Sequence, residues 1–277
     1  MALRLKGAVG AFRNARLGGR GLGTVGLYPY VEEDQEAQGA HAPLQGQSRQ
    51  ASQYGPRLIV AFRTFYMNEP NAQLTGLTIQ ADREQWQVCG LVPPDSDDDP
   101  LIGGVRFVFL GTDGNDSMNP GAGLISWSID GLVASGDIDG IPTNSVAHGG
   151  GTESESPLGI TGIDHIVINT DNLERTSDAI ARATGCELRR IREVNDDMRQ
   201  GFHRLGSVIV EIVERTGAPA GASLWGVVFN VADIDRACEW LGPDVVSPPK
   251  DAVQEGRRIA TVRAIAGLGA PVALMSV

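Results

Sequence analysis

HIVINTDNLER, residues 165–175, recurs as GVVFNVADIDR, residues 226–236, and this repetition decides the fold. Three positions are identical at the constant offset of 61 residues that separates 165 from 226, and most others keep their chemical type. Each copy is an apolar run typical of a buried strand, then a turn containing Asn or Asp, then the first turn of an amphipathic helix. A tandem repeat of one such unit predicts two similar modules in the C-terminal part of the chain.

Each copy continues with three further strand-like segments, so the predicted order of elements is βαβββ, twice. Helices are expected at 173–184 and 234–241, with Asp171 and Asp233 as their N-caps and Gly185 at the end of the first. The expected strands are 163–169, 187–192, 201–205 and 207–213 in the first copy, and 226–231, 245–246, 258–262 and 272–275 in the second.

The chain before residue 158 carries weaker patterns. Residues 1–56 begin with a basic segment, become rich in Gln and Gly, and predict a disordered tail. Residues 57–147 are expected to form a small β-rich unit, and 148–157 have the composition of a linker. An upstream extension of the reading frame is an alternative account of residues 1–150. The strand-like runs before the linker are 58–62, 77–80, 86–89, 105–109 and 124–129.

Composition indicates a globular protein with no nucleic-acid partner. Hydrophobic residues make up 42% and charged residues 21% of the chain, and no apolar run reaches the roughly 20 residues that span a bilayer. A net charge of −11 opposes binding to a polyanionic backbone. The three cysteines are too widely spaced for a disulfide framework or a zinc cluster, so a cytoplasmic location is expected.

The paired βαβββ units, together with GIDHIVI (162–168) and QGFHRLG (200–206), resemble the vicinal oxygen chelate superfamily. That superfamily includes glyoxalases, bleomycin-resistance proteins and extradiol dioxygenases. The resemblance covers about residues 158–277 and implies an α+β, glyoxalase-like domain whose modules curl into an open sheet around a cleft. It also implies a divalent metal held there by His and Glu side chains, and a homodimer, since dimers are common among similar proteins.

The family pattern places metal ligands on the first and last strands of each module. In the first module these positions hold His165 and Glu211, with Glu211 also the candidate catalytic carboxylate. In the second module they hold Gly226 and Ala273, neither of which can bind a metal. Because zinc sites usually have three or four protein ligands, the sequence predicts an incomplete metal site.

Four further residues are expected to line the cleft. Asn169 shares the strand face of His165, Asn230 is its repeat equivalent, and His203 lies on the third strand of the first module. Arg258, beside Arg257, lies on the corresponding strand of the second module, where an inward guanidinium would suit an anionic ligand.

The leading hypothesis is a protein that holds a small organic molecule in its cleft with an incomplete metal site. One alternative is a metal-dependent lyase, isomerase or dioxygenase that uses His165 and Glu211 with additional ligands. Another is a non-catalytic interaction protein, in which the β-rich first half binds a partner.

Overall fold

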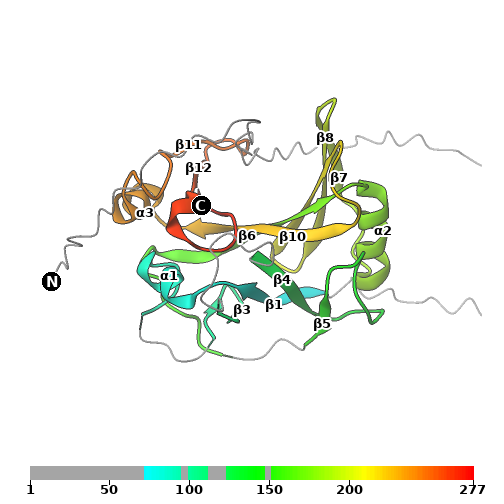
Figure 1. Cartoon of the computed structure of the whole chain (residues 1–277), viewed down its shortest axis with the longest axis horizontal. Helices are drawn as coiled ribbons and strands as arrows, with labels where there is room; N and C mark the ends of the chain where they lie inside the picture. Colours follow the sequence, from blue (N-terminus) through cyan, green and yellow to red (C-terminus); the bar gives the residue numbers. More distant parts are fainter. Residues whose placement is uncertain (1–71, 95–98, 112–122, 147–150) are drawn as a thin grey trace, which may run out of the picture.

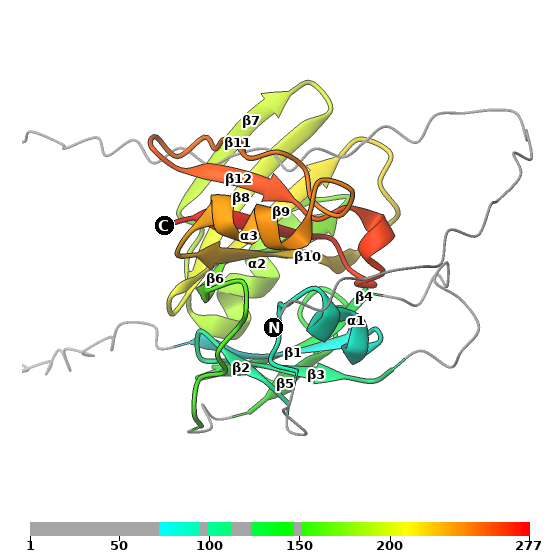
Figure 2. The same ribbon diagram turned by 90° about the vertical axis from the view of Figure 1, so that its left-hand side faces the viewer.

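The computed structural model describes residues 72–94, 99–111, 123–146 and 151–277. Within these ranges the chain forms two β-sheets packed face to face, with α-helices at their flanks (Figures 1 and 2). None of the helices in these ranges is long and apolar enough to cross a membrane. The tail expected at 1–56, the run at 58–62 and residues 148–150 of the expected linker lie outside the described residues.

The C-terminal sheet consists of two βαβββ modules, as the repeat predicts. The first contains β6 (Ile160–Thr170), α2 (Leu173–Thr184), β7 (Arg190–Asn195), β8 (Met198–Leu205) and β9 (Val208–Arg215). The second contains β10 (Ala222–Val231), α3 (Ile234–Leu241), β11 (Lys250–Asp251), β12 (Arg258–Thr261) and β13 (Val272–Ser276). The first strand of each module lies parallel to its last, and β6 and β10 pair antiparallel at the centre. The resulting order is β11-β12-β13-β10-β6-β9-β8-β7.

Local capping explains where the two long helices begin and end. Asn172 caps α2 by accepting a hydrogen bond from the backbone N–H of Arg175, so the prediction of Asp171 as the cap was wrong by one residue. Asp171 instead accepts a hydrogen bond from the Arg175 side chain at 2.7 Å. Asp233 caps α3 and Gly185 ends α2 in the left-handed conformation, both as predicted.

The β-rich region before residue 146 forms a five-stranded sheet. Its elements are β1 (Gln73–Gln80), α1 (Arg83–Val88), β2 (Leu101–Ile102), β3 (Val105–Phe109), β4 (Gly123–Asp130) and β5 (Thr143–Ser145), in the sheet order β2-β3-β1-β4-β5. Strand β1 is parallel to β3 after the α1 crossover, β4 is antiparallel to β1, and β5 is parallel to β4. This connectivity matches that of the eight-stranded sheet, without counterparts of β7, α3, β11 and β12 in the described residues.

Three of the four strand-like runs in this described region are strands, and the fourth is not. Residues 86–89, expected to be a strand, belong to α1 and its C-cap. Asp82 starts this helix by accepting a hydrogen bond from the N–H of Glu84. Trp86 is fully buried, and its indole N–H donates to the carbonyl of Leu268 at 3.0 Å. A four-residue run is too short for its periodicity to distinguish a helix from a strand.

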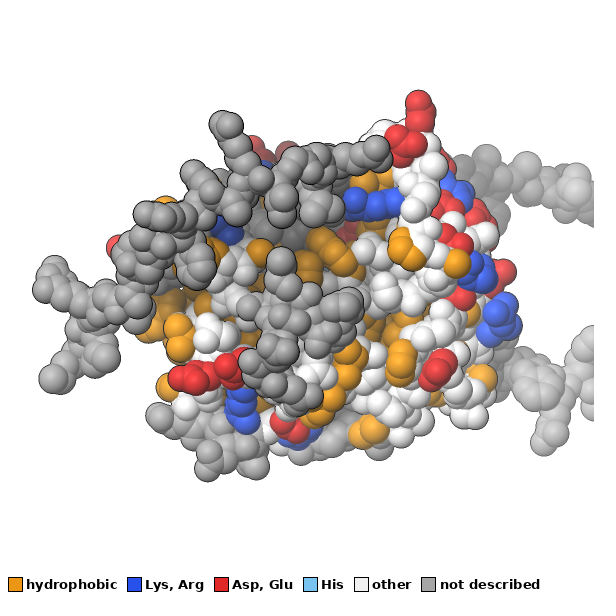
Figure 3. All heavy atoms as spheres, viewed as in Figure 1, with side chains coloured by type: hydrophobic (Ala, Val, Ile, Leu, Met, Phe, Trp, Pro, Cys, Tyr) orange, Lys and Arg blue, Asp and Glu red, His pale blue; other side chains and the backbone are white. Residues whose placement is uncertain are grey.

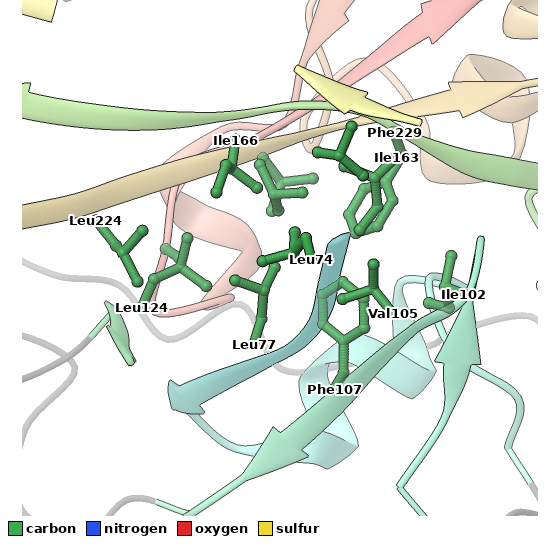
Figure 4. Close-up of a cluster of buried hydrophobic side chains, with 14 of the residues drawn as sticks. Leu74, Leu77, Ile102, Val105, Phe107, Leu124, Ile163, Ile166, Leu224 and Phe229 are labelled. Carbon is green, nitrogen blue, oxygen red and sulfur yellow. The ribbon is translucent and has the colours of Figure 1, made fainter. Parts of the chain in front are cut away.

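The two sheets share one apolar core (Figure 4). Leu77 and Phe107 of the five-stranded sheet point toward Ile166 and Phe229 of the eight-stranded sheet. The Phe107 and Phe229 rings lie 5.7 Å apart between centroids, and Trp86 meets Phe229 edge-on at 6.3 Å. Since each sheet buries its apolar face against the other, the whole described region packs as one unit.

Hydrogen bonds attach the described part of the expected linker to the five-stranded sheet. The Glu153 carboxylate accepts from the backbone N–H groups of Gly103 and Gly104 at 2.8 and 2.7 Å. The backbone N–H of Ser154 donates to the carbonyl of Leu101 at 2.8 Å. The segment before β6 is therefore held against the β2–β3 turn.

Candidate functional site

His165 and Glu211 lie together on the concave face of the eight-stranded sheet. Strands β7–β8 and β11–β12 bend away from the five-stranded sheet, so the face opposite the shared core is the concave one (Figures 1 and 2). The adjacent Ile166 and Val210 point into the shared core, as strand alternation requires. The His165 Nε2 atom lies 3.3 Å from Glu211 Oε2, and both side chains are less than a tenth exposed. The structure thus brings the two predicted residues into contact.

A β-bulge in β6 adds Asp164 to the same face. His165 pairs with Val228 and Ile163 pairs with Phe229, which leaves Asp164 as the extra residue. Ile163 and Ile166 consequently both reach the core although they are three positions apart. Asp164 Oδ2 lies 2.7 Å from His165 Nδ1. This contact fixes the orientation of the imidazole ring from the side opposite Glu211.

Arg257 extends the polar contacts toward the second module. Its guanidinium donates to Asp164 Oδ1 at 2.7 Å and to the side-chain oxygen of Asn230. It also donates to the carbonyl of Ser276 at 2.6 Å and to the side chain of Gln254. Four of the five N–H donors of Arg257 have acceptors, so this guanidinium neutralises Asp164 and does not point freely into the cleft.

Gln200 completes the polar contacts on the side of the first module. Its amide Nε2 donates to Glu211 Oε1 at 2.5 Å, while its Oε1 is buried with no hydrogen-bond partner among the described residues. We call the connected side chains the polar row. The polar row comprises Gln200, Glu211, His165, Asp164, Arg257 and Asn230, and it crosses β8, β9, β6 and β10 to the residue before β12.

The two carboxyl groups of the polar row have opposite electrostatic environments. Burial raises the pKa of Asp164, but hydrogen bonds and charge attraction from His165 and Arg257 outweigh burial, and the net pKa is lowered. Burial raises the pKa of Glu211, and the opposing influences of His165, Arg192 and Gln200 do not cancel that rise. Asp164 is therefore the carboxylate that stays ionised, and Glu211 is the carboxyl that retains a proton more readily.

Two predicted cleft-lining residues lie on the opposite face of the sheet. His203 packs between β8 and α2, with Nε2 2.9 Å from the Ser177 hydroxyl and Nδ1 3.0 Å from the carbonyl of Cys186. Burial lowers the pKa of His203. Arg258 forms an ion pair with Asp235 of α3 at 2.6 Å. Strand parity assigns His203 and Arg258 to the helix side, and Arg257 takes the place on the concave face that Arg258 was expected to occupy.

The other two predicted residues do lie on the concave face. Asn230 belongs to the polar row through its contact with Arg257. Asn169 lines a hollow of about 250 Å³ near the ends of β6 and β9, together with Val213 and Trp225.

The second module cannot supply the metal ligands that its first and last strands would carry. A Cβ atom on Gly226 would lie 2.7 Å from the carbonyl oxygen of Pro271, so the backbone fills the space that a ligand side chain needs. Ala273 is fully buried in an apolar cluster with Val228 and Met275. Among the described residues no group of three His, Cys, Asp or Glu side chains could hold a metal ion. Two donors leave a divalent ion mostly hydrated, so this donor set does not fit a resident metal.

Comparison with known proteins gives similarity of fold only. No family model matches the sequence, and no curated protein matches it. The structure is similar to methylmalonyl-CoA epimerase from Mycobacterium tuberculosis, with 16% identity, a TM-score of 0.37, and coverage of 44% of this chain and 91% of the epimerase.

Two further solved structures are similar over a comparable share of the chain. One is a methylmalonyl-CoA epimerase variant from Streptomyces coelicolor in complex with 2-nitronate-propionyl-CoA, with 21% identity, a TM-score of 0.36, and coverage of 42% of this chain and 94% of that one. The other is a hypothetical protein from Bacillus halodurans C-125, with 13% identity, a TM-score of 0.35, and coverage of 42% and 93%.

Proposed function

Because residues 160–276 have the vicinal oxygen chelate fold, we propose that the protein binds a small organic molecule on the concave face of its eight-stranded sheet, without a complete metal site. The contact between His165 and Glu211 is the observation that carries this proposal. An imidazole and a carboxyl side by side on this face support the proposal, because the resemblance to the superfamily implies a cleft on the same face.

The surroundings of the polar row support a binding role. Apolar side chains flank it on both sides, with Val228, Ala273 and Met275 toward the second module and Val167 and Val213 along β6 and β9. Sites for small organic molecules typically combine an apolar lining with a few placed polar groups that fix orientation. A neutral oxygen of the ligand could accept a hydrogen bond from a protonated Glu211 carboxyl or from an N–H of His165.

A metal-dependent lyase, isomerase or dioxygenase is the second candidate. The convergence of His165 Nε2 and Glu211 Oε2 favours it, because these atoms could share one ion and Glu211 could then act as the catalytic carboxyl. The filled position at Gly226 opposes it, because the second module would have to supply ligands from elsewhere. No mechanistic step through a metal follows from the residues present.

Metal analysis and ligand-induced stabilisation of the full chain test the proposal together. His165→Gln and Glu211→Gln keep side-chain size, and Glu193→Gln, an exposed carboxylate on β7, is the matched control. We expect substoichiometric metal in all four proteins. We also expect at least one compound from a library of small organic acids, ketones and diols to raise the melting temperature of the wild type and of the control, but not of the two site variants.

The other outcomes distinguish the alternatives. One metal per chain that both site variants lose would overturn the proposal in favour of the metal-dependent enzyme. A wild-type protein that no compound stabilises would also overturn it, and would favour the non-catalytic interaction protein.

A further inference from the structure

The geometry points to an anion-binding end of the concave face. We propose that the hollow of about 250 Å³ lined by Asn169, Val213, Arg215 and Trp225 binds the carboxylate end of a single-ring aromatic acid. This inference rests on the proposed function, because it names the chemical class of the ligand and the end of the cleft that recognises it.

The hollow belongs to the concave face that carries the polar row. Asn169 lies four residues beyond His165 on β6, and Val213 lies two residues beyond Glu211 on β9, so alternation keeps all four on one face. Arg215, two residues further, is the last residue of β9. At about 3.3 Å per residue, Arg215 lies about 13 Å along the strand from Glu211. The hollow and the polar row therefore share one face of the sheet.

Arg215 is the cation among the described residues that line this hollow. Its Nε atom is buried with no hydrogen-bond partner among the described residues. The ion pairs of these residues engage other guanidinium groups, such as those of Arg175 and Arg199, but not that of Arg215. A buried guanidinium N–H is costly unless something accepts from it. The planar fork of an arginine matches the two oxygens of a carboxylate.

Trp225 supplies a flat apolar surface because a second bulge redirects it. Ile168 pairs with Leu224 and Val167 pairs with Gly226, which leaves Trp225 as the extra residue of β10. Leu224 points into the shared core, whereas Trp225 lines the hollow. An indole face next to an arginine suits an aromatic ring that bears a carboxylate, and the Asn169 amide can hydrogen-bond a ring substituent.

Size and charge favour this hollow over its larger neighbour. Pockets for drug-sized ligands measure roughly 300–1,000 Å³, so 250 Å³ suits a single ring. A hollow of about 610 Å³ lies beside it at the β7–β8 hairpin, and Arg215 borders both. That larger hollow is lined by Glu193, Asp196 and Asp197, and acidic side chains gather at the hairpin tip (Figure 3). The described lining of the smaller hollow contains no acidic side chain, so an anion is repelled from one and accepted by the other.

Calorimetric titration of the full chain with benzoate tests the inference, with benzyl alcohol and inorganic phosphate as comparison probes. The variants are Arg215→Gln, Arg215→Lys and Trp225→Phe. The matched controls are Arg236→Gln, an exposed guanidinium on α3, and Trp240→Phe, an indole that is 58% exposed. We expect benzoate to bind the wild type and both controls with equal affinity, and Arg215→Gln to weaken it about tenfold or more. Arg215→Lys should fall between them, because a lysine keeps the charge but loses the fork.

Weaker binding of benzyl alcohol than of benzoate, and no competition by phosphate, support a site that recognises both the carboxylate and the aromatic ring. Benzoate affinity within twofold of the wild type in Arg215→Gln would overturn the inference, as would phosphate competing as strongly as benzoate. If benzoate fails to bind while another compound stabilises the chain in a Glu211-dependent way, this inference fails and the proposed function stands. If no compound binds at all, both fail.

Discussion

At the scale of single residues, two extra residues in paired strands place the chemistry of the concave face. Asp164 in β6 and Trp225 in β10 are both bulge residues. Strict alternation predicted His165 and Glu211 on one face, and they do meet there. The same rule assigns Asp164 to the core, because the sequence does not reveal a bulge whose position depends on how two distant strands pair. An aspartate beside His165, between the apolar Ile163 and Ile166, was the signal available.

The charge of Asp164 should matter more than its size. Asp164→Asn leaves the Arg257 guanidinium, which is 21% exposed, without its carboxylate, and we expect a loss of about 2 kcal/mol in the free energy of unfolding. Asp235→Asn is the matched control, since Asp235 pairs with Arg258 at the surface and is 67% exposed. Urea denaturation of the three proteins measures the difference. Equal midpoints for Asp164→Asn and the wild type would show that the buried pair contributes nothing.

Gly226 should tolerate no side chain, because the carbonyl of Pro271 occupies the site of its Cβ. We expect Gly226→Ala to lower the free energy of unfolding by about 1–3 kcal/mol, the usual cost of overpacking. Ser223→Ala, at an exposed position on the same strand, is the control, because it also introduces an alanine but adds no volume to the core. A melting temperature of Gly226→Ala equal to that of Ser223→Ala would mean that Pro271 moves aside easily. In that case a histidine at 226 would deserve testing as a restored metal ligand.

At the scale of elements, the repeat predicted the modules and left their details open. Helices α2 and α3 begin and end at the predicted residues, because each combines an apolar face with a capping residue and a glycine. Strand β7 starts three residues later and β8 three residues earlier than expected, and α1 was mistaken for a strand, since short segments take their structure from tertiary packing. The expected strand at 245–246 contributes one bridge, from Val246 to Val262, and the edge strand is β11 instead.

The buried His203, between β8 and α2, should make the free energy of unfolding depend on pH. Burial lowers its pKa below the ordinary 6.5, so the unfolded chain takes up a proton near pH 6.5 while the folded chain resists it. The unfolded state then binds more protons, and stability falls as the pH falls below that value. We expect His203→Gln to remove part of this dependence, measured as unfolding free energy at about pH 7.5 and about pH 5.5.

The informative quantity is the difference in the free energy of unfolding between the wild type and His203→Gln. Between about pH 7.5 and about pH 5.5 the wild type should lose more unfolding free energy than His203→Gln does. A difference that stays constant would show that His203 is protonated as readily in the folded chain as in the unfolded chain.

At the scale of the whole molecule, one core serves two sheets of the same connectivity. The sequence predicted the eight-stranded sheet from its repeat, but it predicted only a β-rich region before residue 147. In the order β2-β3-β1-β4-β5, β1 pairs parallel with β3 and β4 pairs parallel with β5, as the first and last strands of each C-terminal module do. Strands β1 and β4 pair antiparallel at the centre, as β6 and β10 do, and fewer strands lie outside them. In the described residues no helix follows β4 in the way that α3 follows β10. The five-stranded half therefore lacks one of the periodic helical segments that made the C-terminal repeat visible in the sequence.

A shared core predicts that the described region unfolds as one unit. Phe229→Ala removes a fully buried ring that contacts Trp86 of α1 and Phe107 of the five-stranded sheet, and we expect a loss of about 3–5 kcal/mol in the free energy of unfolding. Circular dichroism and tryptophan fluorescence should report the same lowered midpoint, because Trp86 in α1 and Trp127 in β4 belong to the half of the structure opposite Phe229. Ile265→Ala, at a residue 77% exposed, is the control. Two separate transitions would mean that the sheets unfold independently.

The face-to-face packing of the sheets also limits how two chains could associate. The broad apolar side of each sheet is already covered by its companion within the same polypeptide. Among the described residues, the outer strands, such as β7, β11 or β5, and the concave side stay open to a second chain. A second chain on the concave side would close over the polar row, and ligand entry would be coupled to dissociation of the dimer.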